Sequence, residues 1–395
     1  MSRAIISELS PFVHPPPPPQ QVIQAWEVDA PTMQKFFQEL AQENPVRFTS
    51  EQIFTFTKNY STLLGRGGFG KVYKGKFPNG AKIAVKVLKR GPKKNIEEQF
   101  MAEVGTIGRT HHINLVRLYG FCHDQSISAL VYEYMENGSL DKHLFNETRS
   151  LEWEKLNDIA IGTAKGIAYL HEECHKRIIH YDIKPENILL DSNFTPKVAD
   201  FGLAKLCNRD DTRVTITGYR GTRGYSAPEF MLNNFPITYK CDVYSFGILL
   251  FEIIGRSKNA RVGSNSESLH WFPKNVWEEY EKGELMRLIE VSGIEEKDII
   301  KAERMAMVAI WCVQDSPEAR PPMSAVVKML EGGVEVMPPP KPFQYLFSSG
   351  SDMLKDPSGS WSSLGHTTSE GTNAYWYKEA TTPVMAKYEI QIATS

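Results

Sequence analysis

The sequence predicts an α+β fold in which a small strand-rich lobe is followed by a larger, mostly helical lobe. Strand-like runs separated by glycine and proline turns occupy the stretch between residues 64 and 134. Afterwards apolar residues recur at helical spacing, most clearly in residues 156–173 and 242–254. With 395 residues and 41% hydrophobic content, the chain can bury a substantial core, as one two-lobed domain or two smaller ones with tails.

Charge and cysteine content exclude several classes of protein. Lysine and arginine total 45 against 47 acidic residues, so the formal charge of -2 provides no broad basic surface for nucleic acid. The five cysteines are odd in number and form no C-x-x-C pair. We therefore expect buried, reduced thiols in a cytoplasmic protein rather than disulfides or a zinc site.

Membrane and targeting signals are not predicted in this sequence. The apolar cluster at residues 4–6 is too short for a signal peptide core, and Ser2 excludes myristoylation. The longest apolar stretch, residues 243–254, is interrupted by Ser245 and Glu252 and falls short of the roughly 20 residues that cross a bilayer. We expect no transmembrane span in this chain.

Residues 1–58 are interpreted as a leader. The prolines at 15–19 favour a stiff polyproline segment, which either docks on a polyproline-binding domain or acts only as a spacer. Near the end of the leader, Thr49 and Gln52 have capping-box spacing ahead of apolar residues. This pattern predicts a short helix that packs on the following domain.

A glycine-rich stretch opens the main domain. Residues 64–75 read L-G-R-G-G-F-G-K-V-Y-K-G, and Gly65, Gly67 and Gly70 would let backbone amides approach phosphate oxygens. A dinucleotide-binding fold requires a helix directly afterwards. Here the sequence alternates and then turns at residues 78–80, which predicts a hairpin instead.

The next strand and helix each carry one charged residue of interest. The strand at residues 81–88 contains Lys86, and a lone strand lysine is usually just solvated. The helical stretch at residues 95–109 carries Glu103 within its apolar stripe, where a carboxylate is costly unless it is paired. Strands at residues 115–122 and 129–134 complete a five-stranded small lobe.

The strongest chemical signal lies in residues 178–202. This stretch reads H-Y-D-I-K-P-E-N-I-L-L-D and then K-V-A-D-F-G, with Asp182 and Asp200 on either side of Lys184 and Asn187. One carboxylate can orient a hydroxyl, while the other carboxylate and the amide can carry Mg²⁺ against nucleotide phosphates. The pattern therefore favours phosphoryl transfer.

This stretch resembles the catalytic loop and D-F-G segment of protein kinases. Other kinase motifs occur in the expected order: the glycine loop, Lys86 in I-A-V-K, Glu103, A-P-E at residues 227–229, Asp242 and Arg320. The resemblance implies a bilobal protein-kinase-like fold over residues 59–334, with a five-stranded antiparallel small lobe that contains one helix. It also implies that the chain uses ATP and Mg²⁺.

The resemblance implies specific roles for the site residues. Lys86, paired with Glu103, would contact the α and β phosphates; Asp182 would orient the acceptor hydroxyl and Lys184 would neutralise the γ-phosphate. Asn187 and Asp200 would hold Mg²⁺. Adenine would lie among apolar residues and the hinge backbone, and the pocket behind a tyrosine at the gatekeeper position would be narrow. These are Leu64, Val72, Ala84 and Leu189, with Tyr132 as gatekeeper and Glu133 and Met135 in the hinge.

The segment after Gly202 supplies structural expectations from the same resemblance. Thr222 would pack on the catalytic aspartate, Glu229 would pair with Arg320, and Asp242 would brace the catalytic loop. The candidate phosphorylation sites are Thr212, Thr215 and Thr217, with better odds at the last two.

Tyr181 stands where most kinases carry an arginine that binds the activation-loop phosphate. Our hypothesis is that loop phosphorylation is not the main activating switch here.

The amino-acid sequences of the motifs are most similar to those of plant receptor-like kinases of the rust-resistance and thaumatin-like branch. The similarity covers roughly residues 60–333. Such relatives usually carry an ectodomain and a membrane span, so the chain is interpreted as a cytoplasmic member or a truncated product. A receptor or membrane-associated partner could recruit it to the inner face of the plasma membrane. Lys184 disfavours a tyrosine kinase, which has A-A-R in this loop, and we expect a serine/threonine kinase acting on protein substrates in signalling.

One alternative from another class is a kinase-fold scaffold that binds nucleotide without transferring phosphate. Retention of Lys86, Asp182, Asn187 and Asp200 argues against it. Residues 335–395 are rich in serine and threonine and predict a disordered tail.

Overall fold

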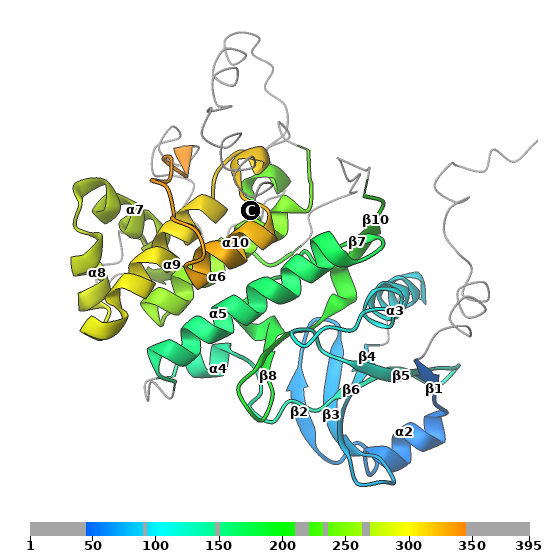
Figure 1. Ribbon diagram of the computed structural model, residues 1–395. Coiled ribbons are helices and arrows are strands. Elements are labelled where there is room, and N and C mark those ends of the chain that lie inside the picture. Colours follow the sequence, from blue (N-terminus) through cyan, green and yellow to red (C-terminus); the bar gives the residue numbers. More distant parts are fainter. Residues whose placement is uncertain are drawn as a thin grey trace, which may run out of the picture.

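The computed structural model describes residues 45–89, 93–146, 151–209, 221–231, 236–262 and 269–344. Figure 1 shows a small lobe built on a sheet and a larger helical lobe, which confirms the predicted bilobal α+β fold. The polyproline run, Thr212, Thr215, Thr217 and the serine/threonine-rich tail lie outside the described residues. The five cysteines are all free thiols, and four of them are buried.

The small lobe contains a sheet with strand order β1-β5-β6-β4-β3-β2. The strands are β1 Val46–Arg47, β2 Leu63–Arg66, β3 Gly70–Lys76, β4 Lys82–Leu88, β5 Leu118–His123 and β6 Ser128–Glu133. The five predicted strands are β2 to β6, and they pair antiparallel. The structure adds a sixth, β1, which runs parallel to β5. A two-residue strand is too short for an alternating pattern to predict it.

Two helices pack on this sheet. Helix α3, Lys93–Ile107, is the predicted helix that carries Glu103. Helix α2, Ser50–Phe56, confirms the helix predicted in the leader: the Thr49 hydroxyl accepts from the Gln52 N–H at 3.2 Å, and the Gln52 side chain accepts from the Thr49 N–H at 2.9 Å. Ile53 and Phe56 of α2 are buried against the sheet, so residues of the leader extend the core of the small lobe.

The large lobe is formed mainly by helices around the buried helix α6 (Figure 1). The helices are α4 Asp141–Leu144, α5 Trp153–Ala168, α6 Lys240–Gly255, α7 Phe272–Lys282, α8 Leu285–Val291, α9 Ile299–Cys312 and α10 Met323–Glu331. A π-helical turn, Tyr169–Glu173, continues α5, and 3₁₀ turns lie at Pro185–Asn187, Phe201–Leu203, Pro228–Phe230, Glu296–Asp298 and Pro317–Ala319. Helices α6 and α9 carry long apolar runs because both are buried on most sides.

Three two-stranded antiparallel sheets complete the described fold. They pair β7 (Arg177–Ile179) with β10 (Lys205–Cys207), β8 (Ile188–Leu190) with β9 (Pro196–Val198), and β11 (Ala260–Val262) with β12 (Leu269–Trp271). The link after α3 is tied to β9, since Val116 N–H donates to Val198 O at 3.0 Å and Val198 N–H to Asn114 O at 2.9 Å. These bonds fix the small lobe relative to the D-F-G segment that follows β9.

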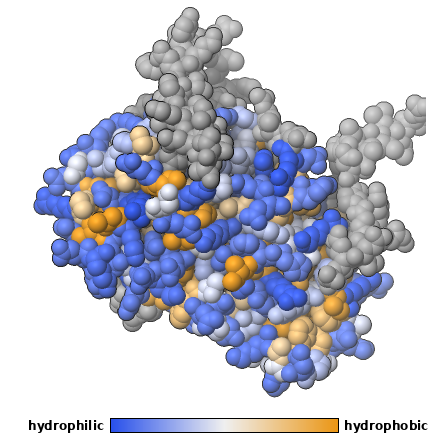
Figure 2. Space-filling view, viewed as in Figure 1, coloured by the Kyte–Doolittle hydropathy of each residue, from blue (hydrophilic) through white to orange (hydrophobic). Residues whose placement is uncertain are grey.

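The face shown in Figure 2 is mostly hydrophilic, with apolar residues in separate small groups. In the part of the chain that the structure describes, no helix has both the length and the apolar character needed to cross a bilayer.

Candidate active site

Three charged side chains meet between the lobes. Lys86 of β4 places its Nζ 2.9 Å from Glu103 Oε2 and 2.7 Å from Asp200 Oδ1. These two ion pairs join β4 to helix α3 and to the D-F-G segment. Burial disfavours the charged form of Lys86, but the two carboxylates outweigh it and raise its pKa. Burial by itself raises the pKa of Asp200, but the positive charge of Lys86 outweighs burial, and the pKa lies below its ordinary value. The expected Lys86–Glu103 pair is present and is extended by Asp200.

The Tyr132 hydroxyl also donates to Glu103, at Oε1. Burial raises the pKa of Glu103 despite the attraction of Lys86, so a second donor helps to satisfy this enclosed carboxylate. Sequence reasoning placed Tyr132 only at the gatekeeper position beside adenine. The hydrogen bond was missed because it joins β6 to α3, 29 residues apart, and no local pattern marks it.

A second network surrounds Asp182 in the loop after β7. Thr222 Oγ1 donates to Asp182 Oδ1 at 2.6 Å, and Lys184 Nζ donates to both Asp182 Oδ2 and Thr222 Oγ1 at 2.7 Å. Asn187 Nδ2 donates to the carbonyl and the carboxylate of Asp182 at 2.8 and 2.9 Å. The expected contact of Thr222 with Asp182 is therefore present, and all four side chains hold one another.

Asp242 fixes the backbone of this loop from within the large lobe. Its side chain is fully buried and accepts from the N–H of His180 and of Tyr181, each at 2.8 Å, and contacts His171 Nε2 at 2.9 Å. Tyr181 has φ 67°, a conformation that is unfavourable for a bulky residue and that these bonds hold in place. The predicted brace is confirmed.

The D-F-G segment has a similar anchor. Asp200 adopts φ 66°, and Phe201 is fully buried with its ring 4.8 Å from that of His180. His180 Nε2 lies 3.0 Å from Ala199 O. Because Phe201 is held in the core, the adjacent Asp200 carboxylate turns toward Lys86.

A cavity of about 750 Å³ lies beside these networks. Its lining contains most of the residues predicted from sequence: Leu64, Gly65, Gly67, Val72, Ala84, Lys86, Glu103, Tyr132, Glu133, Met135, Lys184, Asn187, Leu189 and Asp200. The lining also includes Val116, Ser139, Lys142 and Glu186, which the sequence did not single out. A cavity of this size is within the range of small-ligand sites.

Gly70 and Asp182 are not among the residues that line this cavity. A Cβ on Gly70 would lie 2.2 Å from the backbone oxygen of Val87. Glycine is therefore required here by the close pairing of β3 with β4, which differs from the phosphate approach expected for all three glycines. Asp182 is 4% exposed and is covered by the side chains that bond to it.

Comparison with known proteins decides the family. Residues 59–330 match the family described as protein tyrosine and serine/threonine kinase. The chain belongs to the protein kinase family.

The relatives of this kinase include plant receptor-like kinases. The rust resistance kinase Lr10 of Triticum aestivum is 45% identical over 320 residues, 79% of this chain and 49% of that protein. The PR5-like receptor kinase of Arabidopsis thaliana is 43% identical over 306 residues, 76% of this chain and 45% of that protein. A G-type lectin S-receptor-like serine/threonine-protein kinase of the same plant is 50% identical over 302 residues, 75% and 36% of the two chains. The kinase thus spans less than half the length of each of these three relatives.

Glu229 and Arg320 form the expected ion pair deep in the large lobe of the kinase. Nη1 and Nη2 of Arg320 lie 2.7 and 2.8 Å from the two carboxylate oxygens of Glu229, and both side chains are fully buried. Burial opposes the charge on Arg320, but Glu229 outweighs it and raises the pKa of the guanidinium. The pair ties the A-P-E motif to the loop before α10.

A further buried carboxylate in the kinase has a different environment. Glu252 of α6 accepts from the Tyr225 hydroxyl at 2.7 Å and from Asn259 N–H at 3.2 Å. Burial raises the pKa of Glu252 to about 7. In the sequence Glu252 was noticed only as an interruption of an apolar run, since its partner Tyr225 comes from the segment after Thr222.

Proposed function

We propose that this chain is an ATP-dependent protein serine/threonine kinase that transfers the γ-phosphate of ATP to hydroxyls of protein substrates. The observation that carries the proposal is that the Lys86–Glu103–Asp200 contacts and Lys184, the partner of Asp182, meet at one cavity. Phosphoryl transfer needs a cleft with a cation for the phosphates, oxygen ligands for Mg²⁺ and a carboxylate that can accept the proton of the substrate hydroxyl.

ATP binds with its adenine among Leu64, Val72, Ala84 and Leu189, next to the hinge backbone of Glu133 and Met135. Gly65 and Gly67 carry no Cβ over the same cavity, so their backbone can approach phosphate oxygens. Lys86, held by its two carboxylates, contributes a fixed positive charge toward the α and β phosphates.

The transfer step is assigned to Asp182 and Lys184. The substrate hydroxyl oxygen attacks the γ-phosphorus, the bond from that phosphorus to the β–γ bridging oxygen breaks, and the hydroxyl proton passes to the Asp182 carboxylate. Lys184, 2.7 Å from Asp182, neutralises charge on the phosphoryl oxygens. Thr222 orients the Asp182 carboxylate through its 2.6 Å bond.

Asn187 and Asp200 are proposed as the Mg²⁺ ligands. Both line the cavity, and Asn187 uses its amide nitrogen to bond Asp182, which places its amide oxygen on the opposite side. One carboxylate and one amide oxygen fit a hard cation that keeps several non-protein ligands. Among the described residues no cluster of three or more His, Cys, Asp or Glu forms a separate metal site. When bound, Mg²⁺ neutralises phosphate charge.

We propose serine and threonine as acceptors in receptor-linked or defence signalling. Lys184, with its bond to Thr222, supports the choice of acceptor, and the similarity to the rust resistance kinase and to receptor-like kinases supports the signalling role. A receptor or membrane-associated partner and a polyproline-binding partner remain predictions of the sequence.

The test measures phosphate transfer to a generic basic protein with ATP and Mg²⁺, followed by identification of the labelled residue. Asp182→Asn is expected to lower the rate by about 10²-fold to 10⁴-fold, because it removes the proton acceptor. Asp158→Asn is the matched control, since the Asp158 side chain is exposed on α5. Equal, near-zero rates in wild type and Asp182→Asn would favour the scaffold alternative, and phosphotyrosine as product would exclude the serine/threonine assignment.

A further inference from the structure

The small lobe has a second pocket that shares no lining residue with the nucleotide cavity. It measures about 670 Å³ and lies between the first turn of α3, the end of β4 and the β5–β6 turn. Its lining consists of Tyr60, Tyr73, Val87, Leu88, Lys89, Ile96, Glu97, His123, Asp124, Gln125, Ser126, Ile127 and Ser128. A concave site of this size holds a ligand or a few side chains of a peptide.

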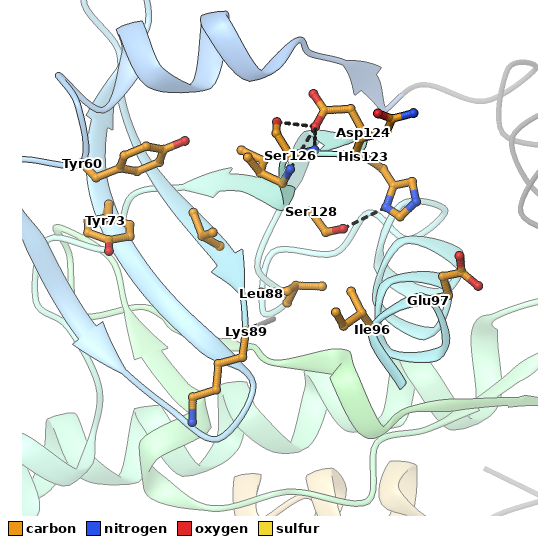
Figure 3. Close-up of a pocket in the computed structure, with 13 residues that line it drawn as sticks. Tyr60, Tyr73, Leu88, Lys89, Ile96, Glu97, His123, Asp124, Ser126 and Ser128 are labelled. Carbon is orange, nitrogen blue, oxygen red and sulfur yellow. Dashed lines mark hydrogen bonds between the residues drawn. The ribbon is translucent and has the colours of Figure 1, made fainter. Parts of the chain in front are cut away.

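Apolar groups form the floor of this pocket and polar groups form its edge. Figure 3 shows Leu88 of β4 and Ile96 of α3 facing each other between the sheet and the helix. On the opposite side the rings of Tyr60 and Tyr73 lie 5.2 Å apart. Asp124 is held at the rim by its bonds to the β5–β6 turn, including one of 2.9 Å from Ile127 N–H. The pocket therefore fits an apolar or aromatic side chain entering from solvent.

We propose that residues 33–44 of this chain dock in the pocket as an amphipathic helix. Met33, Phe36, Phe37 and Leu40 follow the i, i+3, i+4, i+7 spacing of one helical face, while Gln34, Lys35, Gln38 and Glu39 occupy the other. This is the recognition mode in which an apolar helix face enters a hydrophobic groove. Two adjacent aromatic rings match the apolar floor of the pocket.

The start of the described chain lies within reach of the pocket. Pro45 packs at the C-terminal end of α3, with its Cγ 3.5 Å from where a Cβ on Gly108 would lie. Along α3 the distance from Gly108 back to Glu97 is about 17 Å at 1.5 Å per residue. A helix from Phe36 to Pro45 covers about 14 Å and one from Met33 about 18 Å. Running beside α3 in the same direction, the segment brings Met33 level with Ile96 and its aromatic pair within about one helical turn of Ile96.

Strand β1, which directly follows Pro45, contacts the wall of the pocket. Arg47 of β1 pairs with Phe121 of β5, and its Nη2 donates to the carbonyl of His123 at 3.2 Å. His123 lines the pocket. Residues that directly precede β1 therefore begin at the same edge of the small lobe, so docking requires no long connection.

Docking would act on the nucleotide site through α3. Ile96 lies two helical turns before Glu103, the partner of Lys86. A segment packed on Ile96 holds the first turns of α3 against the sheet and so stabilises the Lys86–Glu103 contact. This consequence for catalysis rests on the proposed kinase function, whereas the docking itself does not.

The docking is tested in the full chain by site-specific photocrosslinking. A photoreactive phenylalanine analogue at position 37 is expected to crosslink within the same chain to peptides that contain Leu88, Ile96 or Ile127. The same analogue at position 38, on the polar face, is the control and is expected to crosslink there much less. Crosslinks between two chains, or to other parts of the same chain, would overturn the proposal.

Hydrogen exchange gives an independent measurement that does not require phosphate transfer. In the double variant Phe36→Asp and Phe37→Asp, amides of residues 96–104 and 123–128 are expected to exchange roughly tenfold faster, equivalent to about 1.4 kcal/mol of lost protection. Gln38→Asp is the matched control and is expected to leave exchange unchanged. Identical exchange in the double variant and wild type would refute docking, even in a chain that transfers phosphate normally.

Discussion

Two ion-pair networks in this kinase have similar distances but different surroundings. In the large lobe, Arg320 makes five hydrogen bonds, two to Glu229 and three to backbone carbonyls, so every donor of its guanidinium is used. At the cleft, Lys86 bonds only to carboxylates, and one of them, Asp200, keeps 29% of its side chain exposed. The first network is closed and supports the fold, whereas the second leaves a carboxylate available to a ligand.

Breaking the closed network should have the largest effect on stability. Arg320→Met leaves Glu229 buried without its cation, and we expect a loss of about 3 to 5 kcal/mol in the free energy of unfolding. Denaturant unfolding monitored by tryptophan fluorescence measures it. Lys86→Met is the matched cleft variant.

The cleft variant should lose less stability, because Asp200 is partly exposed and Glu103 keeps its Tyr132 hydrogen bond. It should nevertheless lose phosphate transfer, because Lys86 supplies the charge assigned to the phosphates. If both variants lose equal stability, the distinction between a closed and an open network is wrong.

Glu252 sharpens the comparison, because it is a buried carboxylate whose nearest partners are a hydroxyl and a backbone N–H instead of a cation. Its folded pKa of about 7 lies above the ordinary value of 4.5. The folded state therefore binds the proton more tightly than the unfolded state, and this stabilisation is complete below pH 4.5 and is lost as the pH rises through about 7.

For wild type compared with Glu252→Gln, the difference in unfolding free energy should fall by up to about 3 kcal/mol between pH 4.5 and pH 8. Denaturant unfolding at several pH values measures the difference. Asp315, whose pKa burial raises to about 6, is present in both proteins, so its contribution cancels. Parallel curves for the two proteins would show that Glu252 does not titrate in this range.

The sequence was sufficient for the lobes and for the residues to which the chemistry is assigned. Lys86, Glu103, Asp182 and Asp200 occur in a fixed order of motifs, and each motif requires a particular residue type for a chemical reason. The helix at residues 50–56 was predictable as well, because its capping box is a local signal at Thr49.

Other features depend on which segments become neighbours, and no local pattern contains that information. The Tyr132–Glu103 and Tyr225–Glu252 bonds join elements that are distant in the sequence. The reason for glycine at position 70 is a carbonyl on the next strand. Strand β1 exists because β5 offers a free edge, and two residues carry no periodicity of their own.

The smallest effect is expected in the activation segment. Tyr181 replaces the arginine that usually receives a loop phosphate, and its ring packs 6.1 Å from that of Phe230 in the large lobe. An uncharged ring cannot form the charge-assisted bonds that order a phosphorylated loop. Simultaneous replacement of Thr212, Thr215 and Thr217 by alanine should therefore leave the rate of phosphate transfer close to that of wild type, measured on the same basic protein substrate. Thr222→Ala, which removes the bond to Asp182, is the contrasting variant and should slow transfer. Abolished transfer in a folded triple-alanine protein would show that the loop hydroxyls control the cleft by a route that does not involve position 181.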